Sequence, residues 1–91
     1  MSKRFHVLIS GRVQGIFFRA RTKETADSLG LSGWVKNRPN GQVEAVFEGE
    51  VAALDKMLAW CRQGPALARV TDVDIREEPY AGTFDDFRIL Y

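Results

Sequence analysis

The chain has 91 residues, of which 45% are hydrophobic and 27% are charged, and its formal net charge is +1. This size and composition indicate one globular domain over residues 1–91 rather than a disordered tail. The near-neutral charge argues against general binding to nucleic acid or to an anionic membrane, and no apolar run approaches the roughly 18 residues that a membrane span requires. The single cysteine excludes an internal disulfide, and with a single histidine too few ligands remain for a structural zinc site.

The charges are distributed unevenly along the chain. Residues 1–38 contain eight basic and two acidic residues, whereas residues 39–91 contain five basic and ten acidic ones. This asymmetry favours equally an anion-binding site in the first part and an attraction between the two parts across the fold. The first residues lack the apolar region and cleavage site of a secretory signal, so we expect a cytoplasmic protein. We also expect a monomer without metal or cofactor.

Hydrophobic periodicity predicts seven elements. In chain order they are a strand over 5–9, a helix over 18–29, strands over 33–37 and 42–48, a helix over 50–62, and strands over 70–76 and 87–91. Each helix carries an apolar stripe at helical spacing and ends at a stop signal, Gly30 for the first and Gly64-Pro65 for the second. Asn40-Gly41 predicts a tight hairpin turn, because both residues tolerate positive φ.

The order β-α-β-β-α-β with a short extra strand predicts an α+β fold of the ferredoxin-like type. In this split βαβ sandwich both helices cover one face of an antiparallel sheet. The plan hosts RNA binding, metal transport, regulation and catalysis, so function has to be argued from particular residues.

The best candidate for a functional site is the segment Gly11-Arg12-Val13-Gln14-Gly15-Ile16-Phe17-Phe18-Arg19. It joins a strand to a helix, and its two glycines allow consecutive backbone N–H groups to converge on one oxyanion. Arg19 lies in the first helical turn, where a guanidinium can bind the same anion. Neither the Walker A pattern nor the dinucleotide-binding pattern is present. These residues alone favour phosphate binding and a plain strand-to-helix loop about equally.

A second candidate is Asn37, which ends a strand beside the hairpin turn. Its carboxamide can hold a water molecule without a change of charge, although a role in folding the turn is the simpler interpretation. Cys61 lies on the apolar stripe of a helix, and His6 lies within a strand without a carboxylate nearby in sequence. An enzyme with these residues would work without metal, thiol or imidazole. Hydrolysis of an acyl phosphate fits, because a carboxylate leaves without a general acid.

The sequence resembles the acylphosphatase family at the segment from Gly11 to Arg19 and at Gly33-Trp34-Val35-Lys36-Asn37 with the following Gly41-Gln42-Val43-Glu44. The likeness covers nearly the whole chain, and Ile16 stands where valine is more usual. It implies hydrolysis of a small acyl phosphate to a carboxylate and inorganic phosphate. Arg19 and Asn37 would be catalytic, with Arg19 binding the phosphate and Asn37 orienting the attacking water. Backbone N–H groups would bind the phosphoryl oxygens in the loop of Gln14, Gly15, Ile16, Phe17 and Phe18.

Two other functions fit the same fold. An RNA-recognition domain needs an aromatic, basic third strand, whereas residues 42–48 contain one aromatic residue and two glutamates. A phosphate-sensing module would use the same loop without turnover. A further expectation concerns the chain end, where the terminal carboxylate of Tyr91 would lie near Arg19 and hold it in place.

Overall fold

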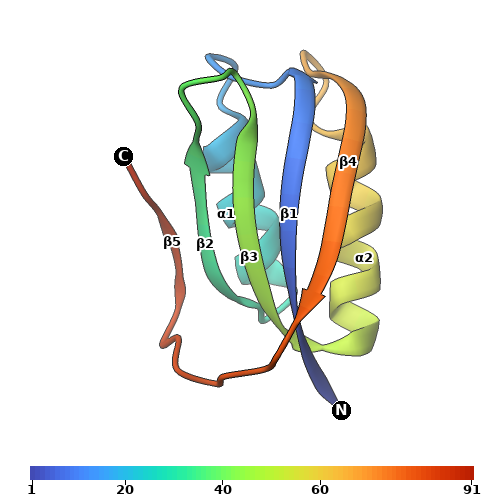
Figure 1. The fold of residues 1–91 in the computed structure, drawn as a ribbon, viewed down its shortest axis with the longest axis vertical. Helices are drawn as coiled ribbons and strands as arrows, with labels where there is room; N and C mark the ends of the chain where they lie inside the picture. Colours follow the sequence, from blue (N-terminus) through green and yellow to red (C-terminus); the bar gives the residue numbers. More distant parts are fainter.

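The computed structural model describes all 91 residues, and its elements follow the predicted order (Figure 1). They are β1 (Ser2–Arg12), α1 (Phe18–Ser28), β2 (Ser32–Asn37), β3 (Val43–Glu50), α2 (Val51–Gln63), β4 (Arg69–Glu78) and β5 (Phe87–Ile89). Strands β1 and β4 are longer than predicted, because they pair with each other beyond the range of apolar alternation. The longer helix, α2, has 13 residues, and neither helix is long and apolar enough to cross a membrane.

The five strands form one sheet in the order β4-β1-β3-β2-β5. The first four pair antiparallel, as predicted, whereas β5 pairs parallel with β2, so the sheet is mixed. The connection from β4 crosses the lower end of the sheet in Figure 1 and brings β5 in at the end where β2 begins. The buried carboxylate of Glu48 on β3 holds this connection, because it accepts hydrogen bonds from the backbone N–H groups of Ala81 and Gly82.

Both helices cover one face of the sheet, as the ferredoxin-like fold requires, and the core lies between them and the sheet (Figure 1). The stacked rings of Phe47 and Phe87, with centroids 5.4 Å apart, join β5 to this core. The rings of Phe18 and Trp60 meet edge to face at 5.6 Å and join the two helices. Phe18 is the first residue of α1, so core packing fixes the point at which the preceding loop becomes a helix.

The opposite face of the sheet carries a charged cluster centred on Glu44 of β3. The Glu44 carboxylate lies 2.6 Å from His6 Nε2, accepts a hydrogen bond from Arg38 Nη1 at 3.1 Å and lies 3.7 Å from Lys36 Nζ. The Glu44 side chain is only 12% exposed. Burial by itself raises the pKa of Glu44, but the hydrogen bonds and positive charges of these three neighbours outweigh it, so the pKa lies below its ordinary value of 4.5.

The lowered pKa of Glu44 predicts a specific acid dependence of stability. A carboxyl group with a lower pKa in the folded state contributes stability above its unfolded pKa and loses this contribution as the pH falls through the folded pKa. The free energy of unfolding should therefore fall below about pH 4.5, and Glu44→Gln should be less stable than wild type at pH 7 but show a smaller acid-induced loss. Urea unfolding at several pH values measures this difference.

The matched control is Glu24→Gln on α1, because the Glu24 side chain is 65% exposed and its ion pair with Arg21 lies on the surface. This variant should keep the acid dependence of wild type. Equal acid-induced losses in wild type and Glu44→Gln would contradict the assigned role of the cluster.

Candidate active site

The loop between β1 and α1 has an unusual backbone. Gly15 has φ +76° and Phe17 has φ +63°, and Phe17 is the only residue other than glycine with a positive φ. Phe17 thus adopts a left-handed conformation directly before the right-handed start of α1, an arrangement that turns successive N–H groups toward one point. The Phe17 side chain is 79% exposed, so its own burial does not offset this strain. Strain of this kind is typical of functional sites.

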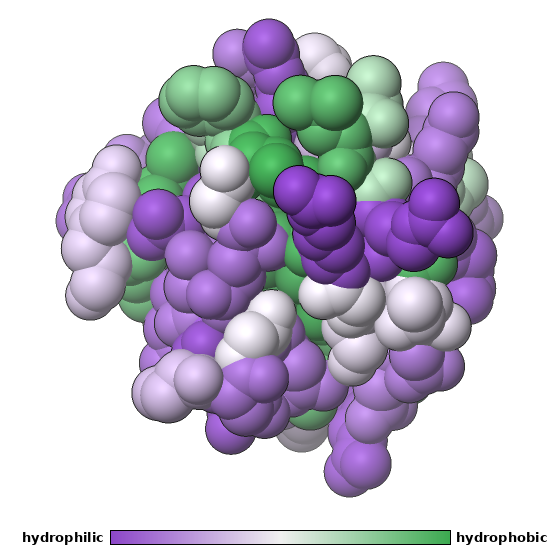
Figure 2. Space-filling model, turned by 90° about the horizontal axis from the view of Figure 1, so that it is seen from above, coloured by the Kyte–Doolittle hydropathy of each residue, from purple (hydrophilic) through white to green (hydrophobic).

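The start of α1 is free to bind an anion. No side chain forms a capping hydrogen bond at its N-terminus, and its first turn contains no acidic residue. The N–H groups of a first helical turn have no partner within the helix, and they carry a partial positive charge. Figure 2 views this end of the molecule from above and shows apolar side chains gathered beside strongly hydrophilic ones.

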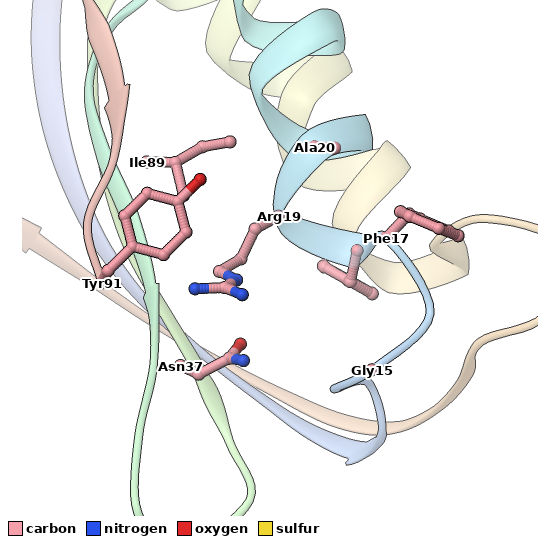
Figure 3. A pocket seen from close by; sticks show the side chains of 8 residues that line it. Gly15, Phe17, Arg19, Ala20, Asn37, Ile89 and Tyr91 are labelled. Carbon is pink, nitrogen blue, oxygen red and sulfur yellow. The ribbon is translucent and has the colours of Figure 1, made fainter.

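A pocket of about 310 Å³ lies between this loop, β2 and β5. It is lined by Gly15, Phe17, Phe18, Arg19, Ala20, Asn37, Ile89 and Tyr91. In Figure 3 the guanidinium of Arg19 and the carboxamide of Asn37 point into the same space, with Gly15 across from them. The structure therefore brings together both residues predicted to be catalytic and three of the predicted loop residues.

Arg19 keeps most of its hydrogen-bonding capacity. Its guanidinium carbon lies 5.0 Å from the ring centroid of Tyr91, and its Nη1 is 3.5 Å from the carbonyl oxygen of Leu90. These contacts with the chain end are made by a ring and a backbone carbonyl, not by the terminal carboxylate that sequence suggested. No acidic side chain pairs with Arg19, although the basic side chains of Arg21 and Lys23 on the same helix are both paired. A guanidinium without an acidic partner can bind an anion with several N–H groups.

Asn37 is the last residue of β2 and faces the start of α1 (Figure 3). Its amide oxygen Oδ1 is buried and accepts no hydrogen bond from the protein. Buried polar atoms are nearly always paired, so this oxygen is suited to a donor that enters the pocket. The turn is instead held by Asn40, whose Oδ1 accepts from the Gln42 backbone N–H and whose Nδ2 donates to the Gln42 side chain. The simpler interpretation of Asn37 as a turn residue therefore does not hold.

Two of the predicted loop residues lie outside the pocket lining. The Gln14 side chain extends to the hairpin, where its Nε2 donates to the carbonyl oxygens of Arg38 and Gln42 at 2.8 Å each. Ile16 is half-buried and packs against the core. The phosphate contacts predicted for their backbone N–H groups stay predictions.

Sequence analysis missed Ala20 and Ile89 as pocket residues. Ala20 follows Arg19 on α1, and its position depends on the tilt of the helix against the sheet. Ile89 reaches the pocket through the parallel pairing of β5 with β2, where it lies opposite Val35. No signal in the sequence indicates this pairing.

The pocket contains no histidine, cysteine or acidic side chain. Burial raises the pKa of the Cys61 thiol to about 12, so this residue is an inert part of the core. No group of three or more His, Cys, Asp or Glu side chains is arranged so that it could hold a metal ion. The pocket can therefore bind a tetrahedral anion through backbone N–H groups and one guanidinium, and can orient a small polar molecule with an amide.

Sequence comparison shows the family to which this chain is similar. The acylphosphatase family model matches residues 5–89. The acylphosphatase of Syntrophus aciditrophicus is 55% identical over 91 residues, which cover 100% of this chain and 95% of that protein. The acylphosphatase of Methylococcus capsulatus is 53% identical over 88 residues, which cover 97% of this chain and 96% of that protein.

Solved structures agree with the sequence comparison. An acylphosphatase from Coxiella burnetii superposes with a TM-score of 0.92 at 38% identity, and the match covers 98% of this chain and 93% of that one. The acylphosphatase from Bacillus subtilis superposes with a TM-score of 0.94 at 35% identity over the full length of both chains. The ferredoxin-like fold is thus confirmed, and the chain belongs to the acylphosphatase family.

Proposed function

We propose that this acylphosphatase cleaves the carboxyl–phosphate bond of small acyl phosphates without a metal ion, by attack of one positioned water on phosphorus. The products are a carboxylate and inorganic phosphate. The proposal rests on the observation that three groups with unused hydrogen-bonding capacity meet in one pocket. These groups are the uncapped start of α1, the guanidinium of Arg19 and the buried amide oxygen of Asn37.

The phosphoryl group binds at the left-handed loop in this mechanism. Backbone N–H groups between Gly15 and Phe18 donate to its oxygens, and the helix start adds a favourable partial charge. Arg19 donates to the same oxygens and stabilises the charge that spreads over them in a loose transition state. The aromatic ring of Tyr91 lies 5.0 Å from the guanidinium carbon, a distance at which the ring face attracts the cation.

Asn37 orients the attacking water. Its Oδ1 accepts a hydrogen bond from the water, so that the oxygen lone pair of the water points toward phosphorus. The water oxygen forms the new P–O bond as the bond from phosphorus to the acyl oxygen breaks, and the electron pair of that bond leaves with the carboxylate. A carboxylate is a weak base, so no protein acid is needed. One proton of the water stays on the attacking oxygen and the other passes to a phosphoryl oxygen, so that the product is dihydrogen phosphate.

The partner implied by this pocket is a small acyl phosphate rather than a nucleic acid or a membrane. The pocket volume of about 310 Å³ suits the phosphoryl group with a small acyl group. We include in the proposal a monomeric state, because one chain supplies every residue that lines the pocket, and a cytoplasmic location.

Replacement of Arg19 tests the phosphate-binding part of the proposal. We expect Arg19→Ala to lose both turnover of benzoyl phosphate in excess EDTA and binding of inorganic phosphate, because a charge-assisted contact is removed. The loss should be on the order of 2–4 kcal/mol in kcat/KM. Arg21→Ala is the matched control, since Arg21 lies on the same helix and pairs with Glu24 outside the pocket. Wild-type phosphate affinity in Arg19→Ala would contradict the proposal.

Replacement of Asn37 separates water positioning from binding. Asn37→Ala should lower kcat on the order of 100-fold while the inhibition constant of inorganic phosphate stays near wild type. Asn40→Ala controls for disturbance of the hairpin, because Asn40 holds the turn without lining the pocket. If Asn37→Ala lost phosphate binding and turnover equally, the assigned role of Asn37 would be wrong. If the wild-type protein bound phosphate without any turnover, the result would favour a phosphate-sensing function over an enzymatic one.

A further inference from the structure

The side chain of Gln14 forms a bridge between two segments that are far apart in sequence. Its Nε2 donates to the carbonyl oxygens of Arg38 and Gln42, which lie 24 and 28 residues away along the chain. Both partners are acceptors, so only the amide nitrogen can face them, and its two N–H groups are both used. The bridge therefore joins the loop before α1 to both arms of the hairpin.

Both carbonyl groups also accept backbone hydrogen bonds within the hairpin, and these bonds do not involve Gln14. The Arg38 N–H donates to the Gln42 carbonyl at 2.8 Å, and the Gly41 N–H donates to the Arg38 carbonyl at 3.1 Å. Each carbonyl oxygen thus keeps one hydrogen bond when the glutamine is removed. A role in forming the hairpin does not explain the bridge, whereas a role in placing the hairpin relative to the loop does.

The bridge lies outside the pocket lining, but two of its residues are the chain neighbours of residues that line the pocket. Gly15 follows Gln14 directly, Asn37 precedes Arg38 directly, and Gly15 and Asn37 line opposite walls of the pocket (Figure 3). The bridge is thus directly adjacent in sequence to the first N–H group that would bind the phosphoryl group and to the amide that would orient the water. No other side-chain hydrogen bond joins the segment from Val13 to Phe17 to the hairpin.

We propose that Gln14 is a positioning residue that sets the separation between the phosphate-binding loop and Asn37. The inference rests on the proposed function and deepens it, because in-line attack requires the water, phosphorus and the leaving oxygen to be aligned. A misplacement of about 1 Å in such an arrangement costs on the order of 100-fold in rate. Gln14 acts on this alignment through the two backbones that it joins and makes no contact with the substrate through its side chain.

The first test is Gln14→Met, which keeps the length of the side chain and removes both donors. We expect kcat for benzoyl phosphate to fall roughly 10- to 100-fold. The inhibition constant of inorganic phosphate should stay near wild type, because Arg19 and the N–H groups of the loop remain. Urea unfolding at neutral pH verifies that the variant is folded. A kcat equal to wild type, or a loss of phosphate affinity as large as the loss of kcat, would overturn the inference.

The matched control is Gln42→Met, the same chemical change at the hairpin end of the bridge. The Gln42 side chain donates to Ser10 Oγ at 2.9 Å and accepts from Asn40 Nδ2 within the turn at 2.9 Å, and it forms no hydrogen bond with the loop before α1. This variant should keep kcat close to wild type. If its kcat fell as far as that of Gln14→Met, general loosening of the hairpin would explain both effects and the bridge would have no special role.

A double-mutant cycle with Asn37→Ala then identifies the group through which Gln14 acts. If the bridge works by placing Asn37, Gln14→Met should cost little further kcat once the Asn37 amide is absent. If the kcat reduction of the double variant equalled the product of the reductions in the two single variants, Gln14 would act independently of Asn37. This result would overturn the inference. This failure is distinct from a failure of the proposed function, in which Arg19→Ala and Asn37→Ala would themselves keep wild-type activity.

Discussion

The left-handed backbone at Phe17 is the constraint on which the rest of the site depends. A residue with a side chain in this conformation costs on the order of 1–3 kcal/mol, and the conformation persists only where the surrounding structure imposes it. Here the imposing residues are Val13 and Phe18, which are buried in the core on either side of the loop, while the Phe17 ring itself stays exposed. The core thus holds both ends of the loop, and the strained turn between them directs backbone N–H groups and Arg19 toward the pocket.

Among the basic residues of positions 1–38, some form ion pairs with acidic residues on the sheet, whereas Arg19 lies in the pocket. At the end of β2, Lys36 and the following Arg38 lie on the open face of the sheet with the carboxylate of Glu44, and Asn37 between them faces the pocket. The two interpretations of the charge asymmetry are therefore compatible. Some basic side chains attract acidic ones of the second part across the sheet, and Arg19 remains free of an acidic partner at the site that the proposed mechanism uses.

Element order and the ends of both helices could be predicted because they follow from local signals, namely apolar periodicity and stop residues. The joint role of Arg19 and Asn37 is implied by the family resemblance, because the residues alone favour a role for Asn37 in the turn. The remaining features depend on how distant segments meet. The parallel direction of β5 follows from a connection held by Glu48. The contact of Arg19 with the Tyr91 ring depends on that direction, and the bridge from Gln14 requires the loop and the hairpin to lie at one end of the sheet.

The most direct test of the central claim is the fate of the water oxygen. An acyl phosphate has two electrophilic atoms, and the proposed arrangement of Arg19 and Asn37 places the water in line with phosphorus and not beside the carbonyl carbon. Benzoyl phosphate should be hydrolysed by the wild-type protein in water enriched in ¹⁸O, and both products analysed by mass spectrometry. Attack at phosphorus predicts that the label enters inorganic phosphate and leaves the benzoate unlabelled. Label in the benzoate would show attack at carbon and would contradict the proposed mechanism.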